Sequence, residues 1–410
     1  MLTRRIYNEF LNDSLVTSVE NGKAHDGAED DKIETQIQLN ISVNLGIKEV
    51  SSYKLGSFIP SNESRNILIA TRGRSGSSFL GSLLSQYPGT FYSFEPLHFR
   101  QHEATPEEQV DLIKHVFRCT PSHQYIQHTT RWLALLNRNF RYRDACRNLK
   151  SLTKNSCVLP DIYFSSCSHF PIRLIKSIRF PFGKAEQLLL DPEIGKTLKI
   201  IFLFRDPRGR LQSLKHKVHW CKPQHPTIDR CNVSNLCGEL KDLVEGAMNV
   251  KEKFPGKFSC RISFQPEKFH FFTPNKYCFL IIFFYTICIR FFVSDRVHLI
   301  RYEDISLDPS KLSEELLKFL DLRNSKYVQN FILNHTQGIH TIERKYNTYR
   351  NSTKEAFNWR NNILEKDVID VQTECAEPMK ILGYNPITNF SENRFNESYE
   401  LLDPLLGEHL

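Results

Sequence analysis

The segment ILIATRGRSGSSF, residues 67–79, decides the fold. Its first residues, Ile67–Thr71, form an apolar run typical of a buried strand, and a helix is expected over Ser77–Gln86. A strand that passes through a glycine-containing turn into a helix directs backbone N–H groups and the positive end of the helix dipole at an anion. The segment therefore predicts a binding site for a phosphate-like group.

The residues of this turn suit an anion. Gly76 lets the backbone approach a ligand closely, Arg74 adds a fixed cation with forked donors, and Ser77 and Ser78 add hydroxyl groups. The turn is not a Walker A loop, because the pattern GxxxxGK[ST] is absent and no lysine precedes the serines. An ordinary turn capped by serine is the alternative interpretation.

A second basic segment, FRDPRGRLQS at residues 204–213, follows the apolar run Lys199–Phe204. Pro207 suits the first turn of a helix, so Arg205 is expected at the strand end and Ser213 further along the helix. Ligands of open α/β sheets bind at the carboxyl ends of the strands, where the first segment also lies. Two basic sites on one edge suit a ligand with phosphates at both ends, whereas a surface cluster of ion pairs is the alternative for the second segment alone.

The rest of the chain supports an α/β fold. From Asn66 onward, short apolar runs alternate with helical stretches, which is the pattern of a mostly parallel sheet. Further strands are expected at Phe91–Phe94, Arg173–Phe180 and Arg296–Arg301, and further helices at Pro207–His219, Glu239–Phe254, Lys311–Leu320 and Lys326–Leu333. We therefore expect a P-loop-like three-layer sandwich whose central, mostly parallel sheet is flanked by helices.

We expect one main domain at residues 65–388, preceded by a polar leader at 1–64 and followed by a tail at 389–410. The leader has little periodicity, which is typical of a stem or disordered segment. Its first twenty residues, Met1–Glu20, contain no apolar run that would act as a signal peptide or signal anchor.

Residues 259–295 interrupt the domain. They contain the long apolar run Cys278–Ile289, which is shorter than the roughly 20 residues of a membrane helix. A translated intron, a true insertion and a membrane segment are the three interpretations, and we favour the intron. Removing the segment joins Phe254–Phe258 to the strand at Arg296–Arg301, and it also removes three of the 11 cysteines.

Charge and cysteine content point to an anionic partner and an oxidising compartment. With 54 Lys and Arg against 46 Asp and Glu, the net charge is +8. The cysteines form no CxxC pairs, and Cys221, Cys231 and Cys237 beside His225 match no standard zinc spacing, so disulfides are expected. Glycosylation sequons, which are used in the secretory pathway, begin at Asn12, Asn40, Asn62, Asn232, Asn334, Asn351, Asn389 and Asn396.

The two basic segments resemble the 5′-phosphosulfate loop and the 3′-phosphate segment of sulfotransferases, most closely those of the Golgi Gal/GalNAc/GlcNAc 6-O-sulfotransferase family. The similar residues are Arg-Ser-Gly-Ser-Ser-Phe at 74–79, Phe-Tyr-Ser-Phe-Glu-Pro-Leu at 91–97, Arg-Asp-Pro-Arg at 205–208 with Ser213, Arg-Tyr-Glu-Asp at 301–304, Trp359-Arg360, Cys375 and Leu382-Gly383-Tyr384. The likeness covers Asn66–Pro386, apart from the interruption. It implies a type II membrane protein of the Golgi lumen, so we expect the anchor upstream of Met1, and it admits a homodimer.

The resemblance also implies 3′-phosphoadenosine-5′-phosphosulfate (PAPS) as co-substrate, with no metal. Arg74 would hold the 5′-phosphosulfate, and Arg205 with Ser213 would hold the 3′-phosphate. The other residues expected to bind the donor are Ser75, Gly76, Ser77, Ser78 and Phe79.

Glu95 is the candidate general base, because a sugar hydroxyl must lose its proton to attack sulfur. It lies at the end of an apolar strand, where burial favours the protonated form. A structural carboxylate paired with an arginine is the alternative. His98 is the reserve base, and although His102 follows it at a spacing that imitates a metal pair, we expect no metal there.

The expected acceptor is a glycan or glycosaminoglycan rather than a nucleic acid, with sulfation at position 6 of a hexose or N-acetylhexosamine implied by the resemblance alone. A basic run guides an anionic polysaccharide or forms a solvated helix face; its members are Arg138, Arg141, Arg143, Arg147 and Lys150. Three other functions remain open: a nucleotide kinase or NTPase with a divergent phosphate loop, a catalytically silent glycan-binding membrane protein of the same fold, and a tyrosine-directed protein sulfotransferase.

Overall fold

The structure is a computed structural model that describes residues 64–99, 103–149, 156–216, 221, 231–255, 294–336, 352–389 and 402. The expected leader up to residue 63 lies outside these residues. So do residues 259–293 of the interruption and, except for residues 389 and 402, the expected tail.

Five strands form the central sheet. They are β1 (Arg65–Thr71), β2 (Thr90–Phe94), β3 (Ile172–Ser177), β4 (Leu198–Phe204) and β5 (Val297–Arg301). Their order is β2-β3-β1-β4-β5, and every neighbouring pair is parallel. The predicted α/β sandwich with a parallel sheet is therefore confirmed.

Both faces of the sheet are buried, which explains the continuous apolar runs of its strands. In β1, Leu68 and Ala70 face one core and Ile67 and Ile69 face the other, and all four are at most 2% exposed. A parallel strand buried on both sides lacks the polar alternation of a surface strand, as the sequence of β1 shows.

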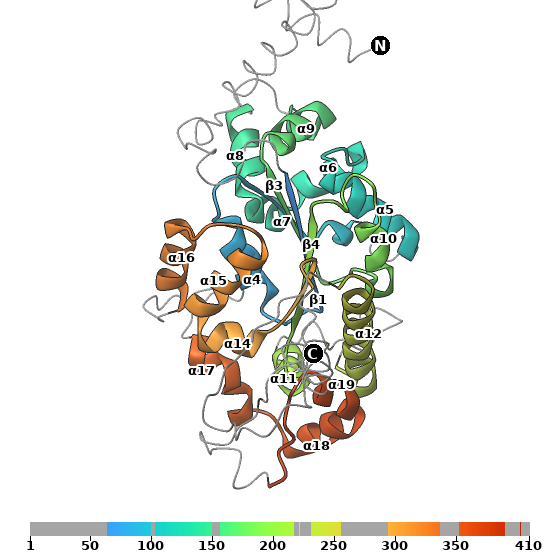
Figure 1. The fold of residues 1–410 in the computed structure, drawn as a ribbon, viewed down its shortest axis with the longest axis vertical. Helices are drawn as coiled ribbons and strands as arrows, with labels where there is room; N and C mark the ends of the chain where they lie inside the picture. Colours follow the sequence, from blue (N-terminus) through green and yellow to red (C-terminus); the bar gives the residue numbers. More distant parts are fainter. Residues whose placement is uncertain are drawn as a thin grey trace, which may run out of the picture. The chain divides into compact units, whose positions relative to one another are not determined.

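Helices cover each face (Figure 1). On one face lie α4 (Ser77–Ser85), α15 (Pro309–Phe319) and α16 (Lys326–Thr336). On the other lie α5 (Pro106–Phe117) and α12 (Val233–Lys253). The sheet is thus the middle of three layers.

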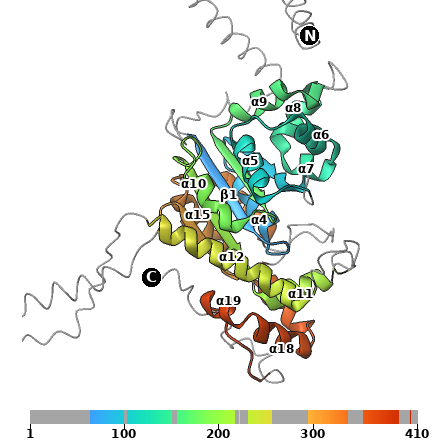
Figure 2. The ribbon, with the colours of Figure 1, turned by 90° about the vertical axis from the view of Figure 1, so that its right-hand side faces the viewer.

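The remaining helices fall in two groups. Those between β2 and α12 are α6 (His123–Arg131), α7 (Leu133–Arg138), α8 (Phe140–Leu149), α9 (Pro160–Ser168), α10 (Ala185–Leu189) and α11 (Pro207–Lys215). Those after β5 are α14 (Tyr302–Leu307), α17 (Ser352–Phe357), α18 (Glu365–Glu374) and α19 (Ala376–Ile381). Short 3₁₀ turns are η2 (Pro96–His98), η3 (Ser156–Val158), η4 (Phe182–Lys184) and η7 (Asn358–Asn361). Figure 2 shows α18 and α19 beside α11 and the first half of α12.

Several predicted boundaries were wrong, among them the start of α12 and the end of β3. Helix α12 begins at Val233 rather than Glu239, because the Asn232 side chain caps it by accepting from the Asn235 N–H. Strand β3 ends at Ser177 rather than Phe180, because the backbone N–H groups of the next two residues bond side chains, Glu95 and Ser177, instead of a neighbouring strand.

Four disulfides join the eight cysteines that lie outside the interruption: Cys119–Cys167, Cys146–Cys157, Cys221–Cys231 and Cys237–Cys375. The prediction of disulfides is therefore confirmed. Cys221, Cys231 and Cys237 have sulfur partners, and no cluster of three or more His, Cys, Asp or Glu suited to a metal occurs within the described residues. None of the described helices has the length and apolarity needed to span a bilayer.

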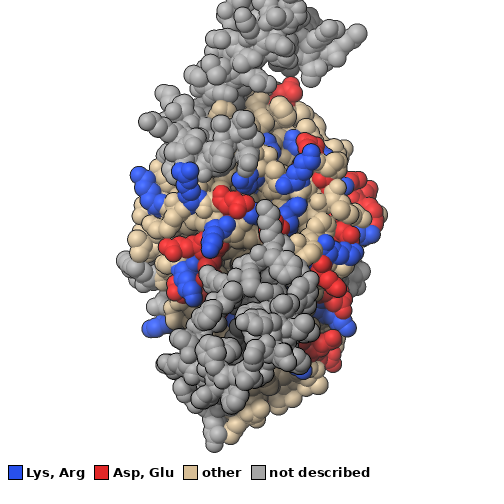
Figure 3. All heavy atoms as spheres, viewed as in Figure 1, with Lys and Arg blue, Asp and Glu red and all other residues tan. Residues whose placement is uncertain are grey.

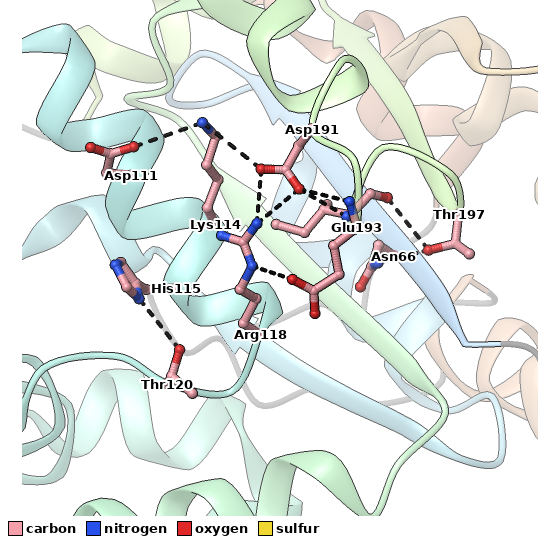
Figure 4. A network of polar contacts seen from close by, with 10 residues as sticks. Asn66, Asp111, Lys114, His115, Arg118, Thr120, Asp191, Glu193 and Thr197 are labelled. Carbon is pink, nitrogen blue, oxygen red and sulfur yellow. Dashed lines mark hydrogen bonds and ion pairs between the residues drawn. The ribbon is translucent and has the colours of Figure 1, made fainter.

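The loop that leads into β4 is pinned to α5 by an ionic network (Figure 4). Arg118, just after α5, donates to both carboxylate oxygens of Asp191 at 2.9 Å and to Glu193 at 2.6 Å. Burial opposes ionisation of Asp191, but hydrogen bonds from the backbone N–H groups of Ile194 and Glu193 and from Arg118 outweigh it and lower the pKa of this carboxyl. This network fixes the start of β4, away from the strand ends that the two basic segments follow.

Candidate functional site

All five strands are parallel, so their carboxyl ends meet at one edge of the sheet. The loop after β1 carries Arg74, the loop after β4 carries Arg205, and Glu95 follows β2 directly. This is the edge at which open α/β sheets bind ligands.

The loop after β1 presents the start of α4. Gly76 is the N-cap residue with a φ of 83°, and no side chain caps the helix. Arg74 is also left-handed, with a φ of 70°. Because the first N–H groups of a helix have no carbonyl partner within it, those of Ser77 and Ser78 are suited to an anion.

Gly76 is also required by its neighbour. A Cβ atom at this position would collide with the ring of Tyr302, the first residue of α14. The turn and the Arg-Tyr-Glu-Asp segment are therefore in contact, although 225 positions separate them in the sequence.

Hydrogen bonds join the two basic segments. Arg205 Nη1 donates to the carbonyl of Arg74 at 2.8 Å, and Arg74 Nε donates to Ser213 Oγ at 3.0 Å. Arg210 Nε donates to the carbonyl of Gly73 at 2.9 Å. The structure thus brings Arg74, Arg205 and Ser213 together at one edge.

Two arginine donors of this region are buried without an acceptor among the described residues: Arg205 Nε and Arg210 Nη1. The guanidinium group of Arg205 lies 4.4 Å from the centre of the Tyr302 ring. Buried donors are almost always satisfied in folded proteins. Their presence here fits a site that receives an anionic ligand.

Not every residue of the first segment faces a ligand with its side chain. Ser75 Oγ lies 2.6 Å from Thr71 Oγ1, which donates to the carbonyl of Leu203 at 2.6 Å, so this hydroxyl ties the loop to β1 and β4. The Phe79 ring packs against Phe331 of α16 at 5.7 Å. These two residues contribute backbone and packing rather than exposed donors.

Two residues of the Arg-Asp-Pro-Arg segment, Asp206 and Arg208, stabilise the fold by pairing with each other. Arg208 is fully buried and bonds the Asp206 carboxylate through Nη2 at 2.7 Å and Nε at 2.9 Å. Its Nη1 donates to Gln372 Oε1 and to the carbonyl of Asn385. Arg208 therefore anchors the C-terminal helices, and a surface ion-pair cluster is excluded for this residue.

Beneath this segment lies a buried carboxyl group. Glu303 Oε1 accepts from the Asp206 N–H at 3.1 Å, and Glu303 Oε2 accepts from the Tyr384 hydroxyl at 2.9 Å. Burial, with the negative charge of Asp206 as a second cause, raises the pKa of Glu303 to about 7.

Glu95 lies at the other end of the same edge, held by two cations. It is 4% exposed, it binds Lys176 Nζ, and its Oε2 accepts from Arg179 Nη1 at 3.0 Å and from the Ile178 N–H at 3.3 Å. The contact with Arg179 matches the alternative that the sequence left open, a carboxylate paired with an arginine, and the role of Glu95 as a base stays a prediction. Burial lowers the pKa of Lys176 even beside this carboxylate.

The sequence did not lead us to Lys176 and Arg179. Lys176 lies within β3, at a position that is 3% exposed. A lysine directly after the apolar residues Leu174 and Ile175, within a predicted strand, is the signal that would have identified it, because a buried cation needs a partner.

The turn η2 directly follows Glu95, and His98 is its last residue. The backbone N–H of His98 donates to the Glu95 carbonyl at 2.9 Å. Its ring Nδ1 lies 3.1 Å from His128 Nε2, and its ring centre lies 4.5 Å from that of Trp132. Burial lowers the pKa of His128. His102 lies outside the described residues.

The basic run does not form one exposed face. Arg138 donates to Ser82 Oγ of α4 at 3.1 Å, and Arg141 donates to the carbonyl of Thr90 in β2 at 2.6 Å, so both side chains bond other elements of the domain. Arg143 pairs with Asp144 at 2.9 Å. The Arg147 side chain and Lys150 lie outside the described residues. Elsewhere on the face in Figure 3, basic and acidic side chains of the described residues are interspersed.

Comparison with known proteins shows the family to which the chain is similar. Residues 64–383 match the sulfotransferase domain family. The chain is 26% identical to carbohydrate sulfotransferase 1 of Mus musculus over 393 residues, covering 82% of this chain and 83% of that protein. It is 25% identical to carbohydrate sulfotransferase 5 of Mus musculus over 417 residues, covering 90% of this chain and 91% of that protein.

Among solved structures, the sulfotransferase domain from the olefin synthase of Synechococcus PCC 7002 is 16% identical with a TM-score of 0.42, covering 80% of this chain and 98% of that one. The family match begins one residue before β1 and ends at Gly383, so it takes in all five strands and both arginine segments. The chain therefore belongs to the sulfotransferase domain family.

Proposed function

We propose that this protein transfers a sulfuryl group from PAPS to a hydroxyl group of a glycan, at position 6 of a hexose or N-acetylhexosamine. The observation that carries the proposal is the hydrogen-bonded union of Arg74, Arg205 and Ser213 at the carboxyl edge of the sheet. The curated relatives are carbohydrate sulfotransferases, which supports a carbohydrate acceptor.

The donor is held at its two phosphorylated ends. Arg74, Gly76 and the N–H groups of Ser77 and Ser78 bind the 5′-phosphosulfate at the start of α4. Arg205 and Ser213 bind the 3′-phosphate, the group that distinguishes this donor from ATP. The buried Nε of Arg205 fits this role, because it finds no acceptor among the described residues.

Transfer is a single displacement at sulfur. The acceptor oxygen forms a bond to sulfur while the bond between sulfur and the bridging phosphate oxygen breaks, and 3′,5′-adenosine bisphosphate leaves. Negative charge grows on the leaving phosphate, where fixed cations and N–H groups stabilise it. The proton of the acceptor hydroxyl passes to a base.

Glu95 is our first candidate for that base, and His98 is the second. Lys176 and Arg179 bond the two carboxylate oxygens of Glu95, so an acceptor hydroxyl competes with these two cations for the same oxygens. His98 lies three positions further along the chain, and its N–H donates to the Glu95 carbonyl. The two candidates are distinguished by substitution, because only the residue that takes the proton is needed for transfer.

We further propose that the protein works in the Golgi lumen, anchored as a type II membrane protein and acting as a homodimer. The family resemblance and the four disulfides support an oxidising compartment.

The test is transfer of ³⁵S-sulfate from PAPS to a panel of desulfated glycans, including chondroitin, keratan-type chains and N-glycans bearing GlcNAc. Arg74→Ala and Arg205→Ala should each lower kcat/KM by about 10²-fold or more, as removal of a charge-stabilising donor does. Arg143→Ala is the matched control, since its partner Asp144 is exposed.

The panel also separates the rival functions. Transfer should persist in EDTA, and ATP should not act as a donor, whereas a kinase or NTPase needs Mg²⁺ and ATP. A catalytically silent binding protein would label no glycan. Equal labelling by the wild type and both arginine variants would overturn the proposal.

For the base, Glu95→Gln and His98→Asn are compared by their pH–rate profiles.

A further inference from the structure

Trp132 lies in the turn between α6 and α7 and is half exposed, at 50%. Its indole ring contacts two imidazoles: the ring centre of His98 is 4.5 Å away in an edge-on arrangement, and that of His128 is 5.8 Å away and stacked. The two imidazoles also bond each other. Trp132 is therefore held in place on one side while half of its surface faces solvent.

The place of this cluster follows from the strand order. Along the edge, Arg205 follows β4, Arg74 follows β1, Lys176 lies in β3 and Glu95 follows β2, which is the outermost strand on that side. Neighbouring strands lie about 4.8 Å apart, so β4 and β2 are separated by roughly 14 Å. His98 follows Glu95 through η2, and α7 packs on β2, so the cluster lies at the end of the row farthest from the 3′-phosphate residues.

We infer that Trp132, His98 and His128 form an acceptor subsite that binds a sugar ring of the glycan adjacent to the one being sulfated. This inference rests on the proposed function and names a further part of its substrate site. An aromatic ring offers a flat apolar face to the C–H groups of a pyranose, and imidazole nitrogens exchange hydrogen bonds with its hydroxyl groups.

The position of Trp132 suits binding of a saccharide better than a role in the hydrophobic core. A tryptophan fixed by its neighbours loses little conformational freedom on binding, so the contact is pre-organised. Glu95, the first base candidate, adjoins the cluster through the turn that His98 ends, so a chain of sugars that reaches Glu95 extends over Trp132. A single sugar at the base leaves Trp132 uncovered.

The first test separates long acceptors from short ones. Trp132→Ala should raise KM for an oligosaccharide acceptor about tenfold, the upper range of an aromatic contact, while KM for PAPS and KM for a monosaccharide N-acetylglucosaminide stay unchanged. Trp132→Phe should recover part of the loss. Phe164→Ala on α9 is the matched control, because Phe164 is also an exposed aromatic residue, at 41%. Equal KM values of the wild type and Trp132→Ala for the long acceptor would overturn the inference.

The second test does not need turnover. Titration of the wild type with the same oligosaccharide should change its tryptophan fluorescence, and Trp132→Phe should lose this change while binding 3′,5′-adenosine bisphosphate normally. A fluorescence change without any sulfate transfer would refute the proposed function, but it would still support binding of a sugar at Trp132. Transfer without loss in either variant would refute the subsite alone, and a shift of Trp132→Ala to a different oligomeric state would assign the surface to a second copy of the chain instead.

Discussion

At the scale of single residues, the phosphate loop depends on two left-handed positions, of which only one is glycine. Gly76 combines a φ of 83° with close contact to the Tyr302 ring, and Arg74 has a φ of 70°. A side chain at position 76 therefore meets both backbone strain and a collision. Arg74 accepts the strained conformation, which directs its Nε to Ser213.

Gly76→Ala should lower the free energy of unfolding by more than 1 kcal/mol, about the cost of a strained backbone conformation, and should weaken binding of 3′,5′-adenosine bisphosphate. Urea unfolding and calorimetric titration measure the two effects. Gly238→Ala is the control, since a Cβ at this exposed position in α12 meets nothing within 4 Å. It should stabilise the protein by up to about 1 kcal/mol through helix propensity. A Gly76→Ala protein as stable as the wild type would contradict our account of the turn.

Glu303 makes stability depend on pH. Its pKa is raised from 4.5 to about 7 in the folded protein, so it holds a proton there that the unfolded chain releases. Its contribution to stability is therefore full below about pH 4.5 and is lost as the pH rises through 7.

Glu303→Gln keeps the shape of the protonated form and should not show this loss. The wild type should lose up to about 3 kcal/mol of its free energy of unfolding between pH 5 and pH 8, because one pKa unit corresponds to about 1.4 kcal/mol. The difference in the free energy of unfolding between Glu303→Gln and the wild type should therefore grow by this amount over the same range. Denaturant unfolding across this range measures the difference, with the exposed Glu245→Gln as control. A difference between Glu303→Gln and the wild type that does not change with pH would show that Glu303 is ionised throughout.

Sequence and structure agree that the two arginines lie at one edge of the sheet, whereas the lysine that pairs with Glu95 was not predicted. Arg74 and Arg205 were expected at one edge, and they are joined by a hydrogen bond. This could be predicted because each residue follows a strong apolar run that marks the end of a strand. Their roles as nucleotide ligands stay predictions. The partners Lys176 and Glu95 are 81 positions apart, and periodicity carries no information on such pairing.

At the scale of elements, the sequence located all five strands of the described sheet. β1 and β4 are continuous apolar runs bounded by polar turns, which is the strongest signal of a buried strand. Helices α5–α10 were not identified individually. The hydrophobic residues of α9, for example, do not follow a clear helical period, because aromatic and cysteine side chains from several helices share one core.

One disulfide connects distant elements. Cys237 in α12 bonds Cys375 at the end of α18, across 138 positions of sequence. Replacing both by alanine should lower the free energy of unfolding by about 2–4 kcal/mol, because the unfolded chain regains the freedom of a long loop. Thermal melting measures this loss, and peptide mapping under non-reducing conditions should recover the four pairs. The Cys221→Ala/Cys231→Ala variant, whose loop spans 10 positions, should lose less.

At the scale of the whole molecule, Ser294, near the end of the interruption at residues 259–295, bonds the chain on both sides of it. Ser294 Oγ donates to the carbonyl of Phe254 at 2.6 Å and accepts from the N–H groups of Arg296 and Val297. The end of α12 and the start of β5 are thus neighbours. A short connection between them is sufficient, so we predict that residues 259–293 can be removed. The interruption expected from the sequence runs to residue 295, and Ser294 is kept because of these bonds.

A variant lacking residues 259–293 should fold, melt within a few degrees of the full chain and keep its sulfotransferase activity. Ser294→Ala in the full chain is the counterpart and should lower the melting temperature, because it removes the bonds that close the junction. A deletion variant that is insoluble or inactive would assign the segment a structural role. Transcript sequencing across the segment tests the intron interpretation directly.

The central claim is that two cationic sites on one edge bind opposite ends of a single nucleotide. Calorimetric titration of the wild type and Arg205→Ala with 3′,5′-adenosine bisphosphate and with 5′-AMP tests it most directly. We expect the wild type to prefer the bisphosphate, and Arg205→Ala to bind the bisphosphate about 10–100-fold more weakly, the range for hydrogen bonds to a charged group, while binding 5′-AMP like the wild type. Equal weakening of both nucleotides by Arg205→Ala, or a wild type without preference for the bisphosphate, would contradict the account.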